Sequence, residues 1–209
     1  MLICFTGIEG SGKTTHISTL IQWIKERGYS SSYMWAGTRP FLSNFFYFFA
    51  YLLGYSGAIR RKEFVDPLKY APQKVTQRLS PFFRAMLFID FQLRVVSSVR
   101  VRLLRYNVVV CDRYFFDLIM ELRICNKSSR FFENLLVQTT PKPDITYLMD
   151  VPEEEASERR NLSIVVFKDR RRAYLKMANE YDFKILDTNK PFKDNAHRIL
   201  DYLSEVFPA

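Results

Sequence analysis

A glycine-rich loop near the start of the chain contains the residue types that bind phosphate groups. Residues 7–14 read Gly-Ile-Glu-Gly-Ser-Gly-Lys-Thr and match the pattern G-x-x-x-x-G-K-[ST]. Glycines let such a loop curl so that its backbone N–H groups point inward. The lysine can then reach terminal phosphates, and the threonine hydroxyl can hold Mg²⁺. The predicted phosphate-binding residues are Gly7, Gly10, Ser11, Gly12, Lys13, Thr14 and Thr15.

Asp112 and Arg113 form a second candidate site. They follow residues 108–111, an apolar run that predicts a strand buried on both faces. Because ligands of parallel sheets bind at the carboxyl ends of the strands, we expect both side chains near the glycine-rich loop. Asp112 could hold Mg²⁺ through water or activate an attacking group, and Arg113 could bind a phosphate or a migrating phosphoryl group. A purely structural Asp–Arg pair is the alternative.

The pattern of apolar residues predicts an α/β domain. Strand-like runs alternate with segments of helical periodicity, which indicates a parallel sheet with helices on both faces. The glycine-rich loop lies between a strand and a helix, the context that phosphate binding requires. Strands are expected over 2–5, 32–35, 108–111, 145–149 and 183–186. Helices are expected before Gly28, from Ser80 to about Tyr106, around 114–124 and 129–138, over 153–160 and 170–181, and after Pro191, with 161–169 as a short connection.

The composition indicates one domain in a reducing compartment. The chain has 209 residues, of which 48% are hydrophobic, enough for a sizeable core. The net charge of +9 favours anionic partners such as nucleotides, nucleic acid or an acidic membrane surface. Cys4, Cys111 and Cys125 are odd in number and lack paired spacing, which argues against disulfides or a zinc site. No signal peptide precedes the first strand-like run, so we expect a cytoplasmic protein.

Residues 41–59 form an aromatic, nearly uncharged stretch about as long as a membrane span. Polar residues and glycines interrupt it, which favours a buried or cleft-lining helix. Contact with a membrane surface through this stretch is the alternative.

Several sequence blocks resemble the thymidylate kinase family of P-loop nucleoside monophosphate kinases. They are residues 7–15 (Gly-Ile-Glu-Gly-Ser-Gly-Lys-Thr-Thr), 109–114 (Val-Val-Cys-Asp-Arg-Tyr) and 143–150 (Pro-Asp-Ile-Thr-Tyr-Leu-Met-Asp), with weaker similarity at 158–160, 172–175 and 185–188. The resemblance implies a three-layer α/β P-loop kinase fold with a five-stranded parallel sheet. It also implies a single domain over residues 1–209, with a lid at about 153–172. The implied activity is Mg²⁺-dependent transfer of the ATP γ-phosphate to a nucleoside monophosphate, typically dTMP.

The resemblance also implies roles for individual residues. Glu9 would approach the sugar hydroxyl of the acceptor, Arg159 would lie at the adenine of ATP, and Arg160 or the arginines at 170–172 would close over the phosphates. The long helix after Ser80 would contact the acceptor and could form a homodimer. The predicted catalytic residues are Lys13, Asp112, Arg113 and Arg160, and the predicted acceptor contacts are Glu9, Arg84, Phe88, Gln92 and Arg113.

Three departures leave the identity of the acceptor open. Residues 35–38 (Trp-Ala-Gly-Thr) stand where the family usually has Pro-Gly-Gly-Thr. Phe88 is followed four residues later by Gln92 where the family usually has arginine, and Arg94 is a shifted substitute. Residues 115–122 replace the Ala-Tyr-Gln that reads thymine, which suggests a divergent branch. A nucleoside, a sugar or an amphiphile is therefore an alternative acceptor.

The remaining alternative is an NTPase that binds nucleic acid or a protein partner. A GTPase should carry Asn-Lys-x-Asp, but Asn189 and Lys190 are followed by Pro-Phe, without the aspartate. A motor should carry an acidic pair after a strand, but Asp112 is followed by Arg113. We therefore expect nucleotide substrates and no stable complex with nucleic acid.

Overall fold

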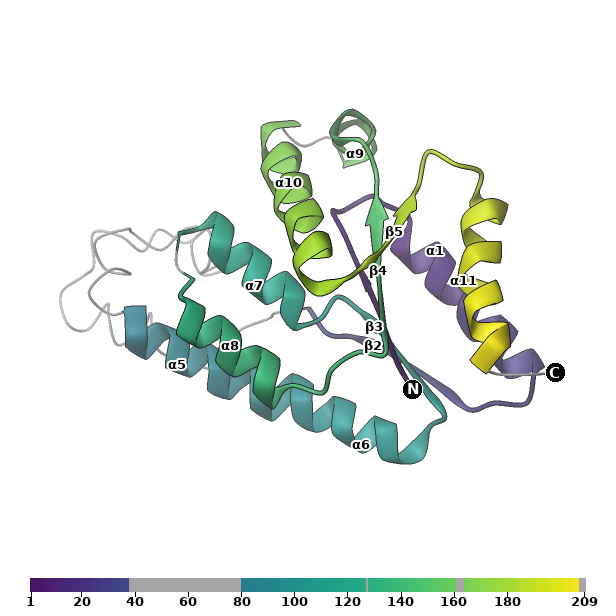
Figure 1. The fold of residues 1–209 in the computed structure, drawn as a ribbon, viewed down its shortest axis with the longest axis horizontal. Helices are drawn as coiled ribbons and strands as arrows, with labels where there is room; N and C mark the ends of the chain where they lie inside the picture. The colour runs from purple at the N-terminus through teal and green to yellow at the C-terminus, as the bar shows by residue number, and fades with distance from the viewer. Residues whose placement is uncertain (38–79, 127, 161–163, 207–209) are drawn as a thin grey trace.

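The protein is built on a five-stranded, fully parallel sheet, as the resemblance implied (Figure 1). A computed structural model describes residues 1–37, 80–126, 128–160 and 164–206; the stretch at 41–59 lies outside them. The strands are β1 (Leu2–Thr6), β2 (Ser31–Trp35), β3 (Val108–Asp112), β4 (Ile145–Asp150) and β5 (Lys184–Asp187), in the spatial order β2-β3-β1-β4-β5.

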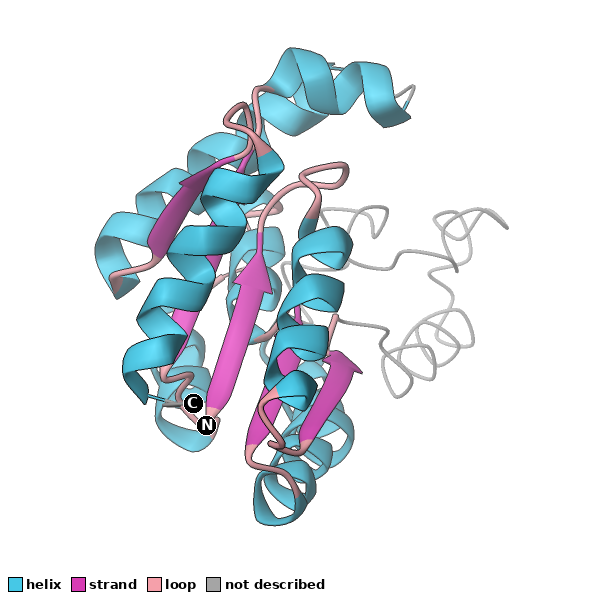
Figure 2. Cartoon of the chain, turned by 90° about the vertical axis from the view of Figure 1, so that its right-hand side faces the viewer, coloured by secondary structure: helices cyan, strands magenta, loops and turns pink. Residues whose placement is uncertain are grey.

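Helices cover both faces of the sheet (Figure 2). On one side, α1 (Lys13–Glu26) and α11 (Phe192–Val206) pack on alternate strand residues such as Ile3 and Val110. On the other side, Cys4 and Val109 lie in the core with the other helices of the described residues. These are α5 (Ser80–Phe91), the π-helical turn η2 (Gln92–Val96), α6 (Ser97–Arg105), α7 (Phe115–Ile124), α8 (Arg130–Thr139), α9 (Glu153–Arg160) and α10 (Ile164–Tyr181). The alternation explains why the central strands read as continuous apolar runs.

One predicted connection is wrong. The sequence suggested a loop over 161–169, whereas α10 already begins at Ile164. Phe167 is fully buried and Arg170 nearly so, three residues apart, and Tyr174 continues the same buried face. The charged residues between them hid this helical periodicity.

The register of the sheet brings the two candidate sites to one edge. Asp112 pairs with Phe5 of β1 and with Trp35 of β2. The glycine-rich loop leaves β1 directly after Thr6, so it lies beside the end of β3. The carboxyl ends of the neighbouring strands β2, β3 and β1 therefore lie together at one edge of the sheet. Cys4 and Cys111, which also pair across β1 and β3, are buried free thiols. Among the described helices, none is long and apolar enough to cross a membrane.

Candidate active site

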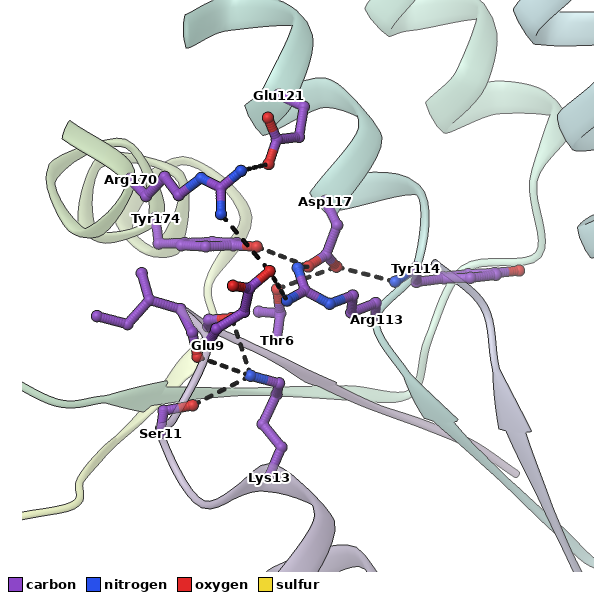
Figure 3. A network of polar contacts seen from close by, with 12 residues as sticks. Thr6, Glu9, Ser11, Lys13, Arg113, Tyr114, Asp117, Glu121, Arg170 and Tyr174 are labelled. Carbon is purple, nitrogen blue, oxygen red and sulfur yellow. Dashed lines mark hydrogen bonds and ion pairs between the residues drawn. The ribbon is translucent and has the colours of Figure 1, made fainter. Parts of the chain in front are cut away.

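The glycine-rich loop wraps around the ammonium group of Lys13 (Figure 3). Its Nζ atom donates hydrogen bonds to the carbonyl oxygens of Gly7 (3.0 Å) and Ile8 (2.8 Å) and to Oγ of Ser11 (3.2 Å). Burial, together with the nearby charge of Arg113, lowers the pKa of Lys13 to about 8. The lysine is thus held by its own loop at the N-terminus of α1, where the helix dipole favours anions.

Gly7 occupies a position that no other residue type fits. Its φ is +135°, and a Cβ atom would lie 2.5 Å from the carbonyl oxygen of Met149 on β4. We expect Gly7→Ala to lower the free energy of unfolding by about 1–3 kcal/mol, as backbone strain of this kind costs. Urea unfolding of both proteins measures the difference. Gly28→Ala is the matched control, because Gly28 also has positive φ (+78°) but a Cβ atom there would meet nothing within 4 Å. Equal losses in both variants would contradict the close contact as the cause.

Asp112 presents a buried carboxylate at the end of β3. Its Oδ2 atom lies 3.5 Å from the hydroxyl of Tyr33, which donates to it. Its Oδ1 atom is buried and has no hydrogen-bond partner in the described part of the chain. Burial raises the pKa of Asp112, although the charges of Lys13 and Arg113 oppose the shift. An unpaired buried carboxylate oxygen is costly, so this atom fits a role as a ligand of a cation or of a water in its shell.

A cleft of about 380 Å³ joins the loop to this strand end. Its lining residues are Glu9, Gly10, Ser11, Gly12, Lys13, Thr14, Thr15, Trp35, Asp112 and Arg113. Thr14 and Asp112 therefore face one space and could share a Mg²⁺ ion with phosphate oxygens. No cluster of three or more His, Cys, Asp or Glu residues suited to a metal occurs among the residues described. Arg159 reaches the same loop, since its Nη1 donates to the carbonyl oxygen of Gly10 (2.9 Å).

Arg113 has an unusual backbone conformation, and a buried aspartate contacts its side chain. Its φ is +67°, and its N–H donates to the carbonyl of Phe5 (2.8 Å). Its Nη1 lies 3.3 Å from Oδ1 of Asp117, and its Nη2 lies 3.6 Å from Oε1 of Glu9. Burial disfavours the charged guanidinium, but Asp117 and the other nearby groups outweigh this and raise the pKa of Arg113. The arginine thus remains charged at the edge of the cleft.

Asp117 is the central residue that sequence reasoning missed. Besides Arg113, it accepts hydrogen bonds from Oγ1 of Thr6 (3.1 Å), the N–H of Tyr114 (2.9 Å) and the hydroxyl of Tyr174 (2.6 Å). Three elements far apart in the sequence therefore meet at one carboxylate. A local signal did exist: Asp117 is the third residue of α7 and forms a capping box with Tyr114.

No protein-family model matches the chain, but individual curated proteins do. A probable thymidylate kinase from Methanothermobacter thermautotrophicus is 29% identical, over 95% of this chain and 87% of the relative. One from Archaeoglobus fulgidus is 28% identical, over 93% and 90%. The thymidylate kinase of Bartonella henselae is 26% identical, over 98% and 95%. The chain is similar to these thymidylate kinases over most of its length. The resemblance noted from the sequence blocks is confirmed along most of the chain.

The three long-helix residues predicted to contact the acceptor do not line the cleft at the glycine-rich loop. Phe88 packs edge-on against Phe132 of α8, with ring centroids 6.4 Å apart. Gln92 donates from Nε2 to Oγ1 of Thr139 (2.7 Å). Arg84 and Phe88 line a separate, mostly apolar cavity of about 300 Å³ between α5 and α8. Arg84, Phe88 and Gln92 are thus not among the residues that line the cleft at the glycine-rich loop, and their acceptor contacts stay predictions. This helix is apolar on several sides, and its buried face carries Leu87, Phe91 and Val95 instead.

The arginines predicted for the lid lie in different surroundings. The side chain of Arg160 lies outside what the structure describes, although the residue ends α9. Arg170 is buried and bonds Glu121 of α7. Arg171 donates to both carboxylate oxygens of Asp150 (2.7 and 2.9 Å). Arg170 and Arg171 are thus anchored to core elements, while Arg172 is exposed.

Proposed function

We propose that the protein transfers the γ-phosphate of ATP to a nucleoside monophosphate, with dTMP as the first candidate acceptor. The observation that carries the proposal is the single cleft in which the Lys13 loop faces Asp112 and Arg113. Phosphoryl transfer needs positioned charge on both sides of the migrating group, and this cleft supplies cations and a carboxylate there. Similarity to proteins named thymidylate kinase supports dTMP as the acceptor.

The loop would hold the donor. The backbone N–H groups of residues 10–14 and the ammonium of Lys13 would bind the β- and γ-phosphates. Bound Mg²⁺, held by Thr14 and by Asp112 directly or through water, would neutralise charge on those phosphates. Arg159, already at the loop, is proposed to lie beside the adenine, and Arg160 to join the phosphates when the lid at about 153–172 closes.

The end of β3 would hold the acceptor. Arg113 would neutralise its phosphate, and Asp112 would orient the attacking oxygen or support the cation. Glu9 projects from the loop into the same cleft and is proposed to accept a hydrogen bond from the sugar hydroxyl. A cytoplasmic location and a homodimer through the long helix stay predictions.

An acceptor panel tests the function. ADP release from ATP and Mg²⁺ is measured with each deoxynucleoside monophosphate, and with nucleosides and sugars as alternatives. Release that requires a monophosphate, largest with dTMP, is the expected result. Release only with a nucleoside or sugar would keep the kinase class and reject the proposed acceptor. Acceptor-independent release, with steeply salt-dependent DNA binding, would instead favour a nucleic-acid-binding NTPase.

ATP affinity should depend on the protonation of Lys13. Its pKa is lowered to about 8, so the ammonium form that phosphates favour is lost as the pH rises through 8. We expect the dissociation constant of a non-hydrolysable ATP analogue with Mg²⁺ to increase by up to about tenfold between pH 7 and 9. Isothermal titration calorimetry at several pH values measures it. The Lys13→Ala variant should show no such increase. A wild-type dissociation constant that does not change with pH would contradict Lys13 as the phosphate ligand.

Trp35 should report on ligands of the cleft. It is one of two tryptophans, its side chain lines the cleft, and it is 40% exposed. The other, Trp23, lies on α1 under the guanidinium of Arg27, 3.8 Å from the ring centroid. We expect dTMP, added with the ATP analogue, to change the intrinsic fluorescence of the protein. Trp23→Phe should keep this change and Trp35→Phe should abolish it; the reverse pattern would place the acceptor elsewhere.

A further inference from the structure

Two polar contacts, each called a rung here, join α7 to α10 (Figure 3). On the first rung, the hydroxyl of Tyr174 donates to Oδ1 of Asp117 (2.6 Å). On the second, Nη2 of Arg170 donates to Oε1 of Glu121 (2.6 Å). The rungs are four residues apart on each helix and run in opposite directions along the chain, so they lie on facing sides of two antiparallel helices. Asp117, Tyr174 and Arg170 are all buried.

The second rung holds the guanidinium group of Arg170 near the carboxylate of Glu9, which Arg113 also approaches. Nη1 of Arg170 lies 3.7 Å from Oε1 of Glu9, and Nη2 of Arg113 lies 3.6 Å from the same oxygen. Each arginine has its own anchor, because Glu121 holds Arg170 and Asp117 holds Arg113. The Glu9 side chain is 41% exposed, against 8% for Arg170. Two fixed guanidinium groups therefore converge on one loosely held, solvent-facing carboxylate oxygen.

A buried ion pair of this kind contributes little to the stability of the fold. Desolvation of both charges largely cancels their attraction, and well-packed apolar side chains of similar size often stabilise as much or more. Guanidinium groups are, however, well suited to phosphate, since each presents several N–H donors in a fixed plane. Glu9 and Arg113 line the cleft, and the guanidinium group of Arg170 lies next to Glu9.

We propose that Arg170, positioned by Glu121, joins Arg113 in a two-guanidinium subsite for the dianionic phosphate group of the acceptor. The carboxylate of Glu9 marks the point of convergence, and an acceptor phosphate competes with it for the two arginines. The ion pair with Glu121 of α7 thus holds the Arg170 guanidinium group at this subsite. This inference rests on the proposed function, and it defines the acceptor by its phosphate and not by its base.

Paired ligands that differ only in the phosphate test the subsite. With the donor loop saturated by a non-hydrolysable ATP analogue and Mg²⁺, calorimetry gives the dissociation constants of each deoxynucleoside monophosphate and of its nucleoside. Their ratio isolates the contribution of the phosphate. For the best-bound pair, we expect Arg170→Ala to reduce this ratio about tenfold or more, the loss of a charge-assisted contact. Lys176→Ala, with the same change of charge at an exposed position of α10, should leave the ratio unchanged.

Glu121 is tested as a positioning residue by a double-mutant cycle. Glu121→Gln should reduce the ratio in the wild-type background and have no further effect in the Arg170→Ala background, which a general loss of structure would not reproduce. The double variant Glu121→Leu with Arg170→Met removes both charges together, so it should fold with a Tm near that of the wild type. It should nevertheless lose the phosphate preference as fully as Arg170→Ala.

Two results would overturn the inference, and they differ in what they say of the function. If the wild type prefers and phosphorylates monophosphates while the folded double variant keeps the wild-type ratio, the subsite is wrong and the proposed function stands. If the wild type binds no monophosphate more tightly than its nucleoside, both the subsite and the proposed acceptor class are wrong. ADP release with other acceptors would still report on the kinase class.

Discussion

Replacing Lys13 with alanine is expected to lower kcat by about two to three orders of magnitude, the usual cost of removing one donor that stabilises transition-state charge. The ammonium group lies at the N-terminus of α1 and is directed at the loop that would hold the β- and γ-phosphates. Among the described residues, its hydrogen bonds run to atoms within residues 7–11. Steady-state ADP release at saturating dTMP measures the effect.

The control for this variant is Lys25→Ala, which removes an exposed lysine from the last turn of the same helix. Its kcat should equal that of the wild type. Circular dichroism and thermal melting should show that Lys13→Ala remains folded, because the substitution removes a buried, desolvated charge whose described hydrogen bonds lie within its own loop. A folded Lys13→Ala protein with near-wild-type kcat would contradict phosphoryl transfer at this loop.

Replacing Asp117 with alanine is expected to cost about 3–5 kcal/mol of stability, as breaking a buried ion pair from one side does. The carboxylate accepts hydrogen bonds from four donors, which would lose their shared acceptor. Arg113 would lose its closest carboxylate partner at the edge of the cleft. We therefore expect activity to fall with stability. Urea unfolding at pH 7 gives the first effect, and the KM for dTMP at a temperature where the variant is folded gives the second.

Asp169→Ala is the matched control for Asp117, because this aspartate lies on an exposed part of α10. It should change the free energy of unfolding by less than about 0.5 kcal/mol, as surface substitutions do. Asp117→Asn should fall between the two, since an amide keeps the shape and one acceptor oxygen but not the charge. If Asp117→Ala costs no more than the control, the network at Asp117 does not hold the site together.

The parts of the protein that the sequence predicted are those encoded by local patterns. The strands around Ile3 and Val110 lie in continuous apolar runs, because both faces of the sheet are covered. The glycine-rich loop is encoded within eight residues, and Asp112 follows its strand directly. A rule about strand ends was then enough to place these residues in one cleft.

The parts that the sequence did not predict depend on distant partners or on the rotation of a helix. Asp117 acts through Tyr174, which is 57 residues away in the chain. Phe88 and Gln92 share a face of their helix, but neighbours such as Leu87 and Ile89 are apolar too, so periodicity could not show which side faces the core. The π-helical turn at Gln92–Val96 alters the helical repeat further along. Acceptor contacts on this helix, which the family resemblance implied, are therefore not brought to the cleft by the described residues and stay predictions.

Transfer of a labelled phosphate tests the central claim most directly. The protein is incubated with Mg²⁺, dTMP and ATP carrying the label at the γ-phosphate, and the products are separated and identified by mass spectrometry. We predict that the label appears in dTDP, that ADP forms in equal amount, and that Lys13→Ala suppresses both. Label found only in inorganic phosphate, with no labelled dTDP, would contradict the proposed transfer between nucleotides.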